Sequence, residues 1–60
     1  MRVLVNGQAA ELAPGMKVRH ALIHLGLLEE VQAGKKVYDA WGNEVGLDGA
    51  VREGTKLFVR

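Results

Sequence analysis

The chain has 60 residues, of which 48% are hydrophobic and 25% are charged, a balance typical of one globular domain spanning residues 1–60. A chain of this size buries only about 60% of its unfolded surface, so a deep active site would have to be taken from a minimal core. Because cysteine is absent, disulfides and thiolate metal sites are excluded, and we expect a cytoplasmic protein. The net charge of +1 gives no excess of cations for phosphate contacts, so nucleic acid is not an expected partner.

The sequence contains few side chains that could act in catalysis. There is no serine, and Thr55 is the single threonine, which excludes the serine and cysteine nucleophile classes. The carboxylates fall in predicted turns or helix ends, and no spacing places two of them across a cleft. The apolar run in residues 1–6 is too short for a signal segment or a membrane span. We therefore expect a protein that is not an enzyme, uses no cofactor and does not enter a membrane.

The first elements predicted are the strands of a hairpin. Residues 1–6 alternate with period two, placing Val3 and Val5 on one face. Asn6-Gly7 supplies positive φ at both central positions of a tight turn, which predicts a second strand over residues 8–12. Pro14-Gly15 then ends this strand.

A helix is predicted over residues 17–25. Gly26 offers a left-handed cap there, followed by a turn or a short second helical piece. The alternative is one helix continuing toward Gly34, which we disfavour because an internal glycine costs about 1 kcal/mol relative to alanine. Lys17 is a poor N-cap, and no better one is visible. The apolar stripe that defines the helix consists of Val18, Ala21, Leu22 and Leu25.

Period two returns in "KKVYDAW", and "WGNE" predicts a turn into a short strand near Val45 and Leu47. We expect Asp39 to accept backbone hydrogen bonds in that turn. Residues 56–60 then alternate as a last strand. The predicted order is strand, strand, helix, strand, short strand, strand, which indicates an α+β fold with a mixed sheet of 4 to 5 strands and one main helix across it.

Two stretches resemble known families. "LAPGMKVRHALIHLGL" resembles the pattern L-x-x-G-x-T-V-x-x-L-L-x-x-L-G-L of the small sulfur-carrier proteins of thiamin and molybdopterin synthesis. Lys17 stands for the usual threonine and Ala21 for a leucine. "LDGAVREGTKLFVR" is similar to the end of ubiquitin-like and TGS domains. The resemblance implies a β-grasp (ubiquitin-like) fold, with the last strand parallel beside the first. The matching residues are Leu12, Gly15, Val18, Leu22, Leu25, Gly26 and Leu27.

The resemblance leaves three functional hypotheses. The one we favour is a non-catalytic ubiquitin-like module that binds another protein. The alternative is a sulfur carrier; such proteins act through a flexible tail closing in Gly-Gly, and the sequence to Arg60 contains none, which disfavours this hypothesis. A TGS-like regulatory domain is the third, and the near-neutral charge disfavours it.

Two motif-like features are interpreted as structural. His20 and His24 have the i, i+4 spacing of zinc ligands, but no third ligand is suggested, so we expect surface histidines and no metal site.

Residues 49–56, "GAVREGTK", imitate a phosphate-binding loop. The motif requires Gly-Lys-Ser/Thr opening a helix, whereas this segment ends Gly-Thr-Lys and opens a strand, so nucleotide binding is not expected.

A partner surface is predicted on the sheet. With Val3, Val5, Leu57 and Val59 turned toward the helix, the alternate positions face outward. In the third strand we expect Tyr38 and Ala40 inward, because the opposite register would turn Asp39 into the core. The result is an apolar centre with a basic rim, a common form of protein-binding surface. The predicted partner-binding residues are Arg2, Leu4, Val37, Trp41, Lys56, Phe58 and Arg60.

Overall fold

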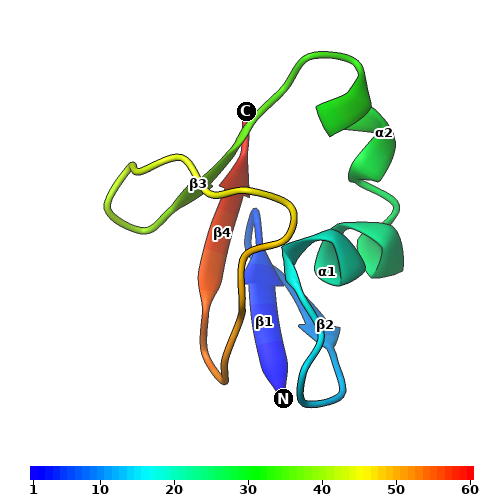
Figure 1. The fold of residues 1–60 in the computed structure, drawn as a ribbon, viewed down its shortest axis with the longest axis vertical. Coiled ribbons are helices and arrows are strands. Elements are labelled where there is room, and N and C mark those ends of the chain that lie inside the picture. The colour runs from blue at the N-terminus through cyan, green and yellow to red at the C-terminus, as the bar shows by residue number, and fades with distance from the viewer.

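The computed structural model describes residues 1–60 and contains one four-stranded sheet with two helices on one side of it (Figure 1). The sheet has the order β2-β1-β4-β3, in which β1 and β4 are parallel and the other neighbours antiparallel. The predicted α+β class and mixed sheet are confirmed. The elements are β1 (Arg2–Val5), β2 (Gln8–Glu11), α1 (Val18–Leu25), α2 (Leu28–Gln32), β3 (Val37–Asp39) and β4 (Lys56–Val59).

The hairpin forms as its turn residues predict. Asn6 has a φ of 51° and Gly7 a φ of 82°, so both central positions are left-handed. This turn sets the register that pairs Val5 with Gln8. The second strand ends at Glu11, one residue earlier than predicted.

The helical region is divided at Gly26. Its φ of 72° is left-handed, and its N–H donates to the carbonyl of Ile23, which ends α1 at Leu25. The predicted break and short second helix are confirmed. At the other end, the Lys17 N–H donates to Nδ1 of His20 at 2.8 Å, so His20 takes the place of the glutamate in a capping box.

The core lies between the sheet and α1. Alternate residues of β1 and β4 point into it, while α1 contributes its predicted stripe. The residues in this cluster are Val3, Val5, Leu12, Val18, Ala21, Leu22, Val37, Leu57 and Val59.

The predicted register of the third strand was wrong. Val37 pairs with Val59 and is 2% exposed, so it faces the core, whereas Tyr38 is half-buried on the outer side and Ala40 is exposed. The expected penalty for turning Asp39 inward does not arise, because Asp39 is the last residue of β3 and its carboxylate accepts backbone N–H groups of the following turn.

The short strand expected near Val45 does not form as an element. Val45 donates its N–H to the carbonyl of Val37 at 2.9 Å, and Glu44 makes an isolated bridge with Tyr38. These contacts fold the chain back along β3 without extending the ladder. The sheet therefore has four strands.

Candidate functional site

The side of the sheet opposite the helices carries the first candidate site. Leu4 of β1 lies beside Lys56 of β4, and Phe58 lies opposite Tyr38 of β3, so apolar side chains from three strands adjoin. Phe58 is 37% exposed although it is a large aromatic residue. We call this the outer sheet face and define it as Arg2, Leu4, Tyr38, Lys56, Phe58 and Arg60.

The charges around the outer sheet face are only partly compensated. Nε of Arg2 lies 3.2 Å from Oε1 of Glu11, the residue beside it on β2. The guanidinium carbon of Arg60 lies 5.1 Å from the centre of the Tyr38 ring, a cation–π contact. Lys56 and Arg60 have no ion-pair partner among the ion pairs of the structure. The face is thus apolar at its centre and positive along β4.

Most of the residues predicted for a partner surface lie on this face. Val37 does not, because it is in the core. Trp41 lies beyond the end of β3, in the turn that follows the strand. The outer sheet face also includes Tyr38, which the sequence interpretation placed in the core.

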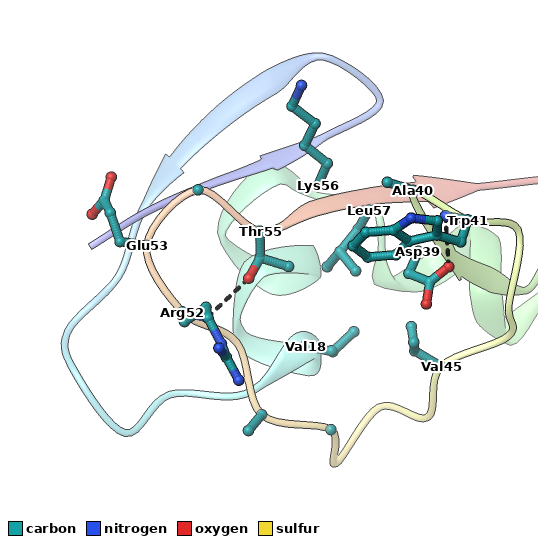
Figure 2. A pocket seen from close by; sticks show the side chains of 13 residues that line it. Val18, Asp39, Ala40, Trp41, Val45, Arg52, Glu53, Thr55, Lys56 and Leu57 are labelled. Carbon is teal, nitrogen blue, oxygen red and sulfur yellow. Dashed lines mark hydrogen bonds between the residues drawn. The ribbon is translucent and has the colours of Figure 1, made fainter.

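A cleft of about 640 Å³ lies next to Trp41 and is the second candidate site (Figure 2). It opens between the end of β3 with its turn on one side and residues 49–55 on the other. Val18 and Val45 point into it from two sides, and Leu57 lies behind them (Figure 2). The interior is therefore mostly apolar. Its other lining residues are Asp39, Ala40, Trp41, Gly49, Ala50, Arg52, Glu53, Gly54, Thr55 and Lys56.

The turn beside the cleft presents Trp41 to solvent. Oδ1 of Asp39 accepts the backbone N–H groups of Trp41 and Asn43, each at 2.9 Å, which confirms the predicted role of this carboxylate. The Gly42 N–H donates to the carbonyl of Asp39 at 3.1 Å, and Gly42 has a φ of 85°. The main chain under Trp41 is fixed, while its side chain is 84% exposed.

Residues 49–55, the segment that imitates a phosphate-binding loop, form the opposite wall. The Arg52 N–H donates to Oγ1 of Thr55 at 3.0 Å, and the Thr55 N–H donates to the carbonyl of Arg52 at 3.1 Å. This closed turn leads into β4, a strand, as the sequence predicted. The phosphate-binding motif needs a helix there.

The two histidines of α1 are not brought together with other ligands. Nδ1 of His20 accepts the Lys17 N–H, and His24 is exposed. No group of three or more histidine, aspartate or glutamate side chains converges anywhere in the structure. None of the helices has the length and apolar character needed to cross a bilayer.

The comparisons found no family model, no curated protein and no solved structure that matches the chain. The candidate sites therefore rest on geometry. Sequence reasoning missed the cleft, since Val18 is far in the chain from Val45 and Arg52. The one local signal of the cleft in the sequence was the segment "DAWGN", residues 39–43, in which an aspartate is followed by a tryptophan and a glycine in a turn.

Proposed function

We propose that this chain is a β-grasp domain that acts as a non-catalytic module and binds a partner protein through the outer sheet face. The strand order β2-β1-β4-β3, with β1 and β4 parallel and the helices on one side, supports the β-grasp assignment. The sequence pattern shared with the sulfur carriers supports it as well.

The single observation that carries the binding proposal is the pairing of apolar side chains with uncompensated cations. Phe58 is exposed and Leu4 half-buried on neighbouring strands, and the adjacent Lys56 and Arg60 lack ion-pair partners. Such a surface favours a partner with an apolar patch bordered by carboxylates, because opposite charges steer the encounter and the apolar centre supplies contact area.

Affinity capture with matched variants tests this function. Wild-type protein, Phe58→Ser and Ile23→Ser are immobilised in parallel, and captured proteins are compared after each variant's melting temperature is measured. Ile23 is a suitable control because it is 55% exposed and lies on α1, away from the sheet's outer side. We expect a partner that binds wild type and Ile23→Ser but not Phe58→Ser. Equal recovery by all three proteins contradicts the proposal.

A sulfur-carrier function is a second candidate, supported by the resemblance of residues 12–27. In the structure, Leu12, Val18 and Leu22 of that motif are core residues, so the shared pattern is explained by packing and supports the fold more than the activity. The intact mass of the protein from its native cell tests the carrier function. A species ending in Gly-Gly, or one carrying sulfur in place of oxygen, would favour it over the binding module. A TGS-like regulatory function is supported by the similarity of the closing residues alone.

A further inference from the structure

The main-chain groups of Ala40 and Lys56 are left unpaired at the mouth of the cleft. Lys36 and Arg60 exchange two N–H to carbonyl bonds, each 2.9 Å long. Such bonded pairs recur at every second residue of an antiparallel ladder, so Tyr38 with Phe58 and then Ala40 with Lys56 follow. The pairing stops at Asp39, and no hydrogen bond joins Ala40 to Lys56. β4 therefore has a free edge at Lys56, turned toward the cleft.

The space beside this free edge suits an apolar side chain. Ligand pockets typically enclose about 300–1,000 Å³, and the cleft measures about 640 Å³. Val45 offers apolar surface in front of the nearly covered Val18 and Leu57, and the Trp41 ring stands at the rim (Figure 2). Exposed tryptophans on fixed main chain are frequent anchors of protein interfaces.

The rim carries two cations, Arg52 and Lys56, and two carboxylates, Asp39 and Glu53, and only the carboxylate side chains are engaged in hydrogen bonds. Asp39 is engaged by the N–H groups of its turn, and Oε1 of Glu53 accepts the Arg2 N–H at 2.9 Å. Arg52 and Lys56 make no ion pair. The Lys56 and Glu53 side chains point away from the interior (Figure 2). An occupant would thus meet an apolar interior bordered by two cations that have no ion-pair partner.

We propose that the cleft holds an extended acidic segment of the partner protein and supplies its specificity pocket. One apolar side chain of that segment enters between Trp41 and Val45, its main chain pairs with the free edge at Lys56, and neighbouring carboxylates face Arg52 and Lys56. This inference rests on the proposed binding function. It extends the partner site from the outer sheet face around the N-terminal end of β4, at Lys56. Strand addition to an exposed edge is a general mode of peptide recognition.

A random peptide library displayed on phage and selected on the immobilised domain is the test. We expect enriched peptides to share an apolar residue with aspartate or glutamate within two positions. Synthetic copies should shift the emission of Trp41, which is the only tryptophan in the chain. By titration calorimetry, Trp41→Ala should weaken binding about tenfold or more, while Ile23→Ala leaves it unchanged. Arg52→Glu should weaken binding and reduce its dependence on salt.

The outcomes separate this inference from the proposed function. Selection of no peptides, selection of basic peptides, or full affinity in Trp41→Ala overturns it, as does self-association of the domain through Trp41. If the peptides bind Phe58→Ser more weakly but Trp41→Ala normally, the outer sheet face is the binding site and the cleft proposal is wrong. If they bind Trp41→Ala more weakly but Phe58→Ser normally, the cleft is the binding site and the proposal for the outer sheet face is wrong. Each variant's fold is checked by its amide NMR spectrum, and because Trp41 is 84% exposed we expect Trp41→Ala to keep the signal dispersion of the folded domain, with shifts only near residue 41.

Discussion

Oδ1 of Asn6 accepts the backbone N–H of Val59 at 2.9 Å, across 53 residues of sequence. The neighbouring bond in the same ladder runs from the Asn6 N–H to the carbonyl of Leu57, also at 2.9 Å. The Asn6 side chain thus continues the parallel pairing of β1 with β4 after the main chain of β1 has entered the hairpin turn. One residue both turns the hairpin and holds the end of β4.

Asn6→Gly should lower the free energy of unfolding by about 1–2 kcal/mol. Glycine keeps the positive φ but leaves the Val59 N–H without its acceptor, and an unpaired backbone donor in a partly buried position costs about this much. Asn6→Asp retains the acceptor and should lose less. Urea denaturation measures the difference, and amide exchange at Val59 should accelerate only in Asn6→Gly. Equal stability of Asn6→Gly and wild type would show that the bond contributes nothing.

His20→Ala should destabilise the domain by about 0.5–1 kcal/mol, because the Lys17 N–H then loses its side-chain acceptor at the start of α1. His20→Gln should restore most of this loss, since glutamine can accept the same bond as in a capping box. The melting temperatures of both variants are compared with that of wild type, and His24→Ala serves as the control because His24 is exposed. Alanine has the higher helix propensity at both positions, so an equal loss in His24→Ala and His20→Ala would show that the cap is not its cause.

Val37→Ala should cost about 2 kcal/mol of stability, as expected for deleting methyl groups from a packed site. Val37→Asp should prevent folding, because it buries a carboxylate without a partner. Circular dichroism of the two variants, beside Lys56→Asp on the exposed side of β4, tests the register of β3 directly. A folded Val37→Asp protein would mean that Val37 faces solvent.

Asp39→Ala should lower stability by about 1–2 kcal/mol and loosen the turn under Trp41, since two N–H groups lose one acceptor. Asp39→Asn keeps an acceptor oxygen and should lie between wild type and Asp39→Ala. Backbone NMR relaxation at Trp41 and Gly42 measures the loosening, and unfolding curves measure the stability. Unchanged relaxation at both residues in Asp39→Ala would assign the rigidity of the turn to its main chain alone.

The hairpin and the break after α1 could be predicted because their determinants are local. Asn6-Gly7 needs only its own dihedral angles to form a tight turn, and Gly26 needs only a left-handed position after an apolar stripe. The last strand was likewise visible from its alternation.

The register of β3 could not be read from its own residues. An alternation of period two allows two registers, one with Val37 and Asp39 inward and one with Tyr38 and Ala40 inward. The prediction chose the second in order to keep Asp39 out of the core. It overlooked that a carboxylate at the end of a strand can accept hydrogen bonds from the turn that follows. The Asn6 to Val59 bond and the cleft depend on residues that only the sheet order brings together. Long-range pairing of this kind has no local signature.

The middle of the sheet is formed by β1 and β4, which are the first and last of its four strands along the chain. Leu4 aligns with Lys56, so the central pairing cannot form during synthesis until residues 56–59 have left the ribosome. Until then, Val3 and Val5 have α1 but no neighbouring β4 to cover them. Without residues 56–59, the hairpin and α1 therefore leave part of their shared apolar surface uncovered, and the sheet is complete only when β4 lies between β1 and β3.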